Sequence, residues 1–95
     1  MRYSIILSPD AANCLKGMKA NLRSLVREGI IEYLGNEPEK VSKSRIKRLR
    51  GVERPQYRLR IGDIRVYYDV GEQSVEILAI VTKKRAKEWL ERHGN

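Results

Sequence analysis

Three arginines flank one short turn in the stretch YRLRIGDIRVYY: Arg58 and Arg60 precede Gly62-Asp63, and Arg65 follows it. A Gly-Asp pair between two β-rich runs predicts a two-residue hairpin. In that register Arg60 lies opposite Arg65, and all three guanidinium groups lie on one face of the sheet. Like charges in opposite positions destabilise a sheet, whereas guanidinium groups match phosphate geometry. The spacing therefore predicts an anion site, of a kind that can stabilise a phosphoryl transition state.

Other residues are expected to border this arginine face. Tyr67 falls opposite Arg58 in the same register, where its ring could stack on a base or its hydroxyl could donate a proton. Cations at a helix N-terminus oppose the helix dipole, and three of them follow the strand expected beside that of Arg65. The candidate ligand-binding residues outside the hairpin arginines are Lys47, Arg48, Arg50, Tyr67, Lys83, Lys84 and Arg85.

The net charge of the chain supports a polyanionic partner. The chain of 95 residues has a formal net charge of +8. Residues 43–65 contain nine basic and two acidic residues, a net charge of +7, whereas residues 1–42 contribute +1 and residues 66–95 contribute zero. A basic block of this kind is typical of proteins that bind nucleic acid, although it can also serve as a solubilising surface.

Composition excludes several other classes of protein. Hydrophobic residues make up 41% of the chain and charged residues 34%, as in a folded domain. No apolar run is long enough to span a membrane, and the N-terminal run is too short for a signal peptide. With Cys14 and His93 as the single cysteine and histidine, neither a disulfide nor a zinc site is expected. We expect a cytoplasmic protein that binds no metal, no cofactor and no membrane.

The elements that must position these residues follow from periodicity. A β-rich run at 2–7 precedes a helix that opens at Ser8-Pro9-Asp10, and the apolar period of residues 22–34 predicts a second helix. Short turns separate the strands expected at 46–50, 57–61, 64–70 and 74–81, and the helical period returns from Thr82. The predicted fold is a single α+β domain over residues 1–95, of order β-α-α-β-β-β-β-α. Its antiparallel sheet has the helical hairpin on one face and a short C-terminal helix.

This order of elements resembles the RelE/ParE superfamily of toxins from type II toxin–antitoxin systems. The resemblance covers essentially the whole chain and is most specific in the segments KRLRG, YRLRIGDIRVYYDV and VEILAIVTKKRAKEW. It implies a small basic toxin that a cognate antitoxin protein neutralises, with operator DNA bound only through the antitoxin. RelE-like members enter the ribosomal A site and cut mRNA, whereas ParE-like members share the fold and poison DNA gyrase.

The resemblance to RelE-like nucleases also implies catalytic positions. The paired basic residues of the strand before the hairpin fall on Arg58 and Arg60, and the arginine of the next strand falls on Arg65. The arginine after the last strand falls on Arg85 or, with a shift of one residue, on Lys84. The tyrosine that usually follows is absent, because the aligned position holds Trp89 or Leu90.

Three functions remain open at this point. The favoured one is ribosome-dependent, metal-independent cleavage of mRNA, in which the arginines bind the scissile phosphate. The alternatives are inhibition of gyrase without nuclease activity, and a degenerate toxin that acts only in a complex with antitoxin and operator. Arginine stabilises charge well but is a poor base, so the chemistry of proton transfer separates the first function from the others.

Overall fold

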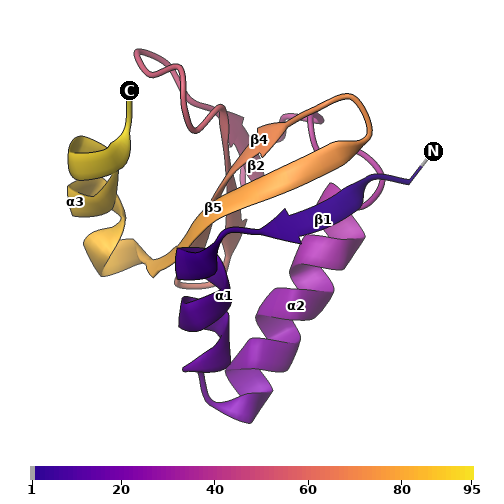
Figure 1. Cartoon of the computed structure of the whole chain (residues 1–95), viewed down its shortest axis with the longest axis vertical. Helices are drawn as coiled ribbons and strands as arrows, with labels where there is room; N and C mark the ends of the chain where they lie inside the picture. The colour runs from indigo at the N-terminus through magenta and orange to yellow at the C-terminus, as the bar shows by residue number, and fades with distance from the viewer. Residues whose placement is uncertain (1) are drawn as a thin grey trace.

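The computed structural model describes residues 2–95, and its elements follow the predicted order (Figure 1). The strands and helices are β1 (Ser4–Leu7), α1 (Pro9–Lys16), α2 (Ala20–Leu34), β2 (Ile46–Arg48), β3 (Tyr57–Ile61), β4 (Ile64–Val70), β5 (Ser74–Thr82) and α3 (Lys83–His93). The predicted α+β class is confirmed. None of the helices formed by residues 2–95 combines the length and apolarity needed to cross a membrane.

The start of α1 and the middle of α2 show how local sequence sets the helical hairpin. Ser8 caps α1, since its hydroxyl accepts a hydrogen bond from the Ala11 amide at 3.1 Å, and Pro9 occupies the first turn. Gly29 lets α2 approach the sheet closely, because a Cβ atom there would lie 2.7 Å from Cδ1 of Ile61 in β3. The hairpin therefore packs tightly under the strand that carries two of the site arginines.

The five strands form one sheet in the order β1-β5-β4-β3-β2. Neighbouring strands from β2 to β5 are antiparallel, as expected from their short connections. The sheet is nevertheless mixed, because β1 pairs parallel to β5 at its edge. The chain passes through α1 and α2 between β1 and β2, and these two strands lie at opposite edges of the sheet.

Helices cover both faces of this sheet (Figure 1). The main core lies between the sheet and the α1–α2 hairpin and includes Val26, Leu34, Leu59 and Tyr68, each 0% exposed. A smaller cluster lies on the other face, where α3 packs on β4 and β5. The arginine face is thus the face that α3 partly covers.

Candidate nucleic-acid interface

The register of the β3–β4 hairpin is the one predicted. Arg60 pairs with Arg65 directly across the two strands, and Arg58 pairs with Tyr67. Lys47 of β2 pairs with Arg58 on the other side, which extends the basic row across a third strand. The structure therefore brings together four basic residues from three adjacent strands on one face of the sheet.

Arg65 is the innermost of these cations, with a side chain only 7% exposed. Its Nη1 atom donates to the carbonyl oxygens of Gly62, at 2.8 Å, and Ile64, at 3.2 Å. Burial lowers the pKa of Arg65, and the neighbouring positive charges of Arg58 and Arg60 lower it further. The three guanidinium groups are therefore close enough to repel one another, and an anion between them would relieve that repulsion.

Arg58 has a buried donor without an acceptor. Its Nε atom is inaccessible to solvent and makes no hydrogen bond with any described group. Among residues 2–95, no carboxylate lies within ion-pair distance of Arg58, Arg60 or Arg65. A buried, unsatisfied N–H on a cation is costly unless a ligand accepts from it, so the arrangement favours a bound anion.

Two carboxylates further along this face belong to Asp69 of β4 and Glu76 of β5, which lie directly opposite each other. Both contact Arg54 instead: its Nε lies 2.6 Å from Oδ2 of Asp69, and its Nη2 lies 3.0 Å from Oε1 of Glu76. Asp69 also accepts from the backbone amide of Gln56 at 2.8 Å, and its carboxylate raises the pKa of Arg54. Arg54 thereby keeps these acids away from the arginine cluster.

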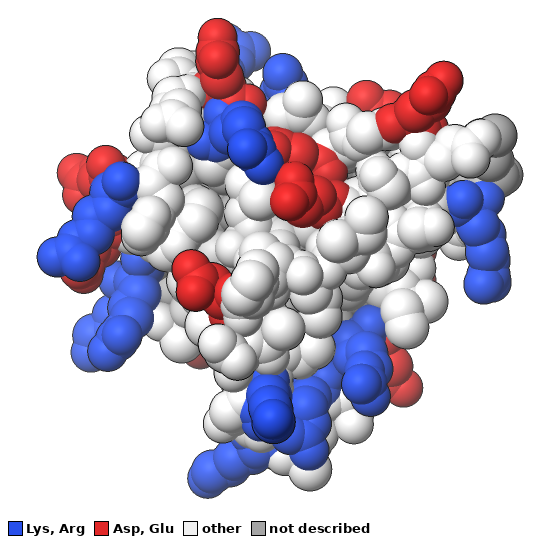
Figure 2. Space-filling model, viewed as in Figure 1, with Lys and Arg blue, Asp and Glu red and all other residues white. Residues whose placement is uncertain are grey.

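The basic residues at the start of α3 border the same face. The Lys83 amide donates to the Asp63 carbonyl at 2.6 Å, which ties the start of α3 to the tip of the hairpin. Lys84 and Arg85 are exposed. Arg85 lines a groove of about 370 Å³ with Trp89 and Val81, and Val81 lies directly across from Arg65. Figure 2 shows basic side chains next to acidic ones over α3, at the left of that view, and a group of basic side chains over the lower end of the α1–α2 hairpin.

Two of the predicted residues, Arg48 and Arg50, lie elsewhere, and a third, Tyr67, is covered. Arg48 lies on the opposite face of the sheet, where its guanidinium carbon is 5.0 Å from the centroid of the Tyr57 ring. Arg50 is exposed in the connection between β2 and β3. Tyr67 is on the arginine face but is only 3% exposed, because Trp89 stacks on its ring. A base could therefore reach the Tyr67 ring only if α3 moved.

The arrangement suits phosphate binding better than proton transfer. The Tyr67 hydroxyl donates to the Ala86 carbonyl at 3.4 Å, and burial raises its pKa. The His93 ring lies tilted against Trp89 near the end of α3, with ring centroids 5.1 Å apart. No group of three or more His, Cys, Asp or Glu side chains within residues 2–95 is placed to hold a metal ion.

The sequence did not indicate the roles of two further residues in this site. Arg54 holds the carboxylates, and Arg45 donates from Nη1 to the carbonyl of Arg60 at 3.0 Å. Both lie in irregular segments, where no periodicity indicates the direction of a side chain. Only the high density of basic residues in 43–65 pointed to this region.

The chain is similar to known toxins in both sequence and fold. Residues 5–87 match the family model described as the ParE toxin of the type II toxin–antitoxin system parDE. The search of curated proteins found no match.

Solved structures of RelE proteins share the fold. The toxin–antitoxin complex RelBE2 from Mycobacterium tuberculosis matches with a TM-score of 0.73 and 23% identity, over 86% of this chain and 99% of that one. The RelE–RelB complex from Pyrococcus horikoshii matches with a TM-score of 0.67 and 27% identity, over 90% and 99%. Free Escherichia coli RelE matches with a TM-score of 0.70 and 16% identity, over 98% and 99%. Together with the family match, these likenesses place the chain in the RelE/ParE superfamily: it is a member of the ParE toxin family of type II toxin–antitoxin systems.

Proposed function

We propose that this toxin inhibits translation by cutting mRNA on the ribosome, with the scissile phosphate bound by Arg58, Arg60 and Arg65. The observation that carries the proposal is the shared face of these arginines, which have no carboxylate partner within residues 2–95. The buried, unpartnered Nε of Arg58 supplies a donor that a phosphate oxygen would satisfy once the groups covering it move aside. A single-stranded RNA backbone is the polyanion that such a row of cations fits.

The proposed reaction uses the RNA itself as nucleophile. The 2′-oxygen attacks the adjacent phosphorus, the bond from phosphorus to the 5′-oxygen breaks, and a 2′,3′-cyclic phosphate forms. The proton lost by the 2′-hydroxyl is balanced by the proton gained by the 5′-oxygen. The arginines neutralise charge on the pentacovalent phosphorus and do not move protons, because a guanidinium stays protonated. Arg85 and Lys84 add positive charge at the start of α3.

Expression of the toxin without an antitoxin, followed by mapping of mRNA 5′ ends, tests this proposal. Breaks inside translated codons are expected for the wild type and are expected to disappear in Arg60→Ala, an exposed position. Arg65→Ala is expected to abolish growth arrest while antitoxin binding stays nearly intact. Because Arg65 is buried, Arg65→Lys and a thermal melt of each variant separate loss of the site from loss of the fold. Growth arrest that persists in a folded Arg65→Ala variant would count against the proposal.

Inhibition of gyrase is the second candidate function. It is favoured by the family model, which describes a ParE toxin, and by the burial of the Tyr67 hydroxyl, the one hydroxyl predicted on the arginine face. This function predicts DNA damage signalling with no codon-phased breaks. Expression without growth arrest would instead indicate a degenerate toxin that acts only with its antitoxin at an operator.

The partner proposed for this chain is an antitoxin with an acidic segment that lies over the arginine face. RelE proteins from Pyrococcus horikoshii and Methanococcus jannaschii were crystallised with RelB. Carboxylates from such a segment would pair with cations that have no acidic partner within residues 2–95. Operator DNA would then be bound through the antitoxin. A complex that leaves the arginine face bare would refute this placement.

A further inference from the structure

We propose that Arg45 is a positioning residue, which sets the place of Arg60 in the arginine face by holding its main chain. This inference rests on the proposed function, because it assigns a role to Arg45 in the same phosphate site. It starts from a pair of hydrogen bonds at the point where β2 begins. The Arg60 amide donates to the Arg45 carbonyl at 2.9 Å, and Nη1 of Arg45 donates to the Arg60 carbonyl at 3.0 Å. Both polar groups of the Arg60 main chain are thus bound by one residue.

The side chain of Arg45 takes the place of its own amide. In a regular antiparallel pair, the amide of Arg45 would donate to the carbonyl of Arg60. Here that amide is turned away and donates to Oγ of Ser42 at 3.0 Å, and the Ile46 amide donates to the same oxygen at 3.2 Å. Without the guanidinium, the Arg60 carbonyl would therefore lose its partner on the β2 side of the strand.

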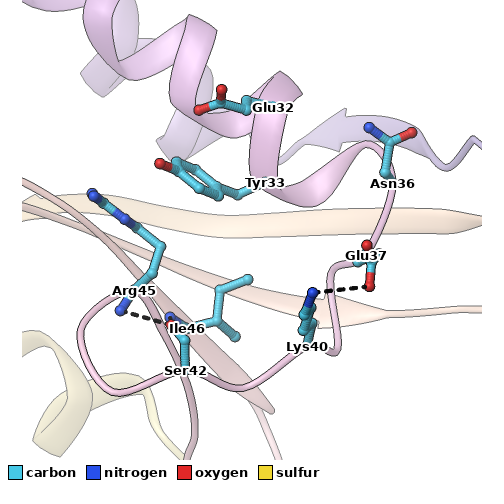
Figure 3. A pocket seen from close by; sticks show the side chains of 8 residues that line it. All are labelled: Glu32, Tyr33, Asn36, Glu37, Lys40, Ser42, Arg45 and Ile46. Carbon is cyan, nitrogen blue, oxygen red and sulfur yellow. Dashed lines mark hydrogen bonds and ion pairs between the residues drawn. The ribbon is translucent and has the colours of Figure 1, made fainter.

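The guanidinium of Arg45 is itself held from α2. Its central carbon lies 4.9 Å from the centroid of the Tyr33 ring, a distance typical of a cation–π contact. Figure 3 shows the side chain of Arg45 extending towards Tyr33 across an open groove of about 420 Å³, which runs between the end of α2 and the segment before β2. Arg45 therefore links the helical hairpin to the main chain of β3 at the arginine face.

Arg60 depends on such support more than Arg65 does. Arg65 is buried and bonded to two carbonyl oxygens near it. The side chain of Arg60 is exposed, and no ion pair or side-chain hydrogen bond holds it within residues 2–95. The main chain, which Arg45 holds, therefore fixes only the point from which this side chain reaches towards the phosphate. A small rotation of β3 at Arg60 would move its guanidinium away from the phosphate that it shares with Arg65.

A double-mutant cycle tests this role. The probe is a fluorescent single-stranded RNA oligonucleotide, 2′-O-methylated so that it cannot be cut, and its affinity is measured by anisotropy. Arg45→Met is expected to weaken binding by about threefold to tenfold in the wild-type background, and hardly at all in the Arg60→Ala background. Equal losses in both backgrounds would overturn the proposal, because they would show that Arg45 acts independently of Arg60.

Two further variants separate positioning from charge and from folding. Arg27→Met removes the same charge from an exposed position of α2 and is expected to give equal, small losses in both backgrounds. Arg45→Lys keeps a cation over Tyr33 and one donor for the Arg60 carbonyl, so it is expected to restore part of the affinity. If Arg45→Lys binds no better than Arg45→Met while both melt like the wild type, the positioning role is refuted.

An NMR measurement on the free protein distinguishes failure of this inference from failure of the proposed function. In Arg45→Met, the amide of Arg60 is expected to exchange faster with solvent and to shift, with smaller changes at Arg65. An unchanged Arg60 amide would overturn the inference even if RNA binding fell. If the wild type neither binds nor cuts RNA, the proposed function fails and the role of Arg45 in that site falls with it. If the wild type binds and the cycle is additive, only the inference fails.

Discussion

The rings of Tyr67 and Trp89 stack almost parallel, with centroids 4.9 Å apart and planes inclined by 11°. Tyr67 belongs to β4 and lies among the site arginines, whereas Trp89 belongs to α3. The stack is therefore the centre of the contact that holds α3 on the arginine face, together with Ala79 and Ala86. It also decides which aromatic surface is open to a ligand, since Trp89 rather than Tyr67 lines the groove beside Arg85.

Removal of the Trp89 ring is expected to loosen α3. Trp89→Ala should lower the free energy of unfolding by about 2–3 kcal/mol, because it removes a stacked and partly buried ring. Trp89→Phe keeps a stacking partner for Tyr67 and should cost less than half as much. Urea unfolding followed by circular dichroism measures both, since the variants lack the only tryptophan of the chain. A loss below about 0.5 kcal/mol, as for an ordinary surface substitution, would contradict the packing role.

The close approach of α2 to β3 predicts that Gly29→Ala destabilises the wild-type protein but not the Ile61→Val variant. Gly29→Ala gains helix propensity, about 1 kcal/mol, but its Cβ would lie 2.7 Å from Cδ1 of the buried Ile61. Overpacking of this kind costs about 1–3 kcal/mol, so a net loss of stability is expected. In Ile61→Val the Cδ1 atom is absent and the closest remaining atom is Cγ1 at 3.1 Å, so a shift of a few tenths of an ångström suffices and the same change should be close to neutral. An equal change in the free energy of unfolding in the two backgrounds would show that Ile61 does not restrict how closely α2 packs on β3.

Alkaline pH is expected to destabilise the fold through Tyr68. Its side chain is 0% exposed and donates to the Pro38 carbonyl at 2.6 Å, and burial raises its pKa well above the ordinary value. Above about pH 10 the unfolded chain releases this proton while the native protein retains it. The contribution of Tyr68 to the free energy of unfolding is therefore fully present below about pH 10 and is lost as the pH rises further.

Urea midpoints between pH 8 and pH 11 measure this effect. Tyr68→Phe should be less stable than the wild type at pH 8, by about 1 kcal/mol, because the Pro38 carbonyl loses its donor. Its midpoint should then fall less steeply above pH 10, since the titrating group is gone. The same slope in both proteins would exclude Tyr68 as the source. Burial also raises the pKa of Tyr67, so Tyr67→Phe should reduce the slope in the same direction.

Arg54 is expected to affect the site more than the fold. Arg54→Gln should cost no more than about 1 kcal/mol of stability, because the ion pairs of this largely exposed side chain are screened by water. It also leaves the carboxylates of Asp69 and Glu76 without their ion pair on the arginine face. RNA affinity should therefore fall by more than the loss of one positive charge alone would cause. Adding Asp69→Asn should restore part of that affinity. No recovery in the double variant would show that Asp69 does not oppose the bound RNA.

The β3–β4 hairpin is the part of the site that could be predicted best from the sequence. Gly62-Asp63 fixed the register, so the pairing of Arg60 with Arg65 could be predicted residue by residue. The helical period that begins at Thr82 likewise places Trp89 on the side of α3 that packs on the sheet, where it stacks on Tyr67. In both cases a regular period, of two in the strand or of about 3.6 in the helix, determines the direction of the side chain.

Where the period is lost, the side chains could not be placed from sequence. The short strand β2 ends at Arg48, so the predicted edge strand 46–50 contained only three strand residues, and Arg50 lies outside it. The register of β2 places Arg48 on the face of Tyr57, away from the arginine cluster. The roles of Arg45 and Arg54 depend on the three-dimensional course of irregular segments. The pairing of β1 with β5 joins segments far apart in the sequence, so the local pattern of residues does not predict it.

That pairing of the first strand with the last also has a kinetic consequence. Ser8 follows β1 and donates from Oγ to the carbonyl of Leu78 in β5, a contact that spans 70 positions of the chain. Closure of so long a loop is entropically costly and slows folding. The β3–β4 hairpin joins neighbours in sequence, whereas β1 can complete its edge of the sheet only after β5 is in place, so the pairing of β1 is expected late in folding.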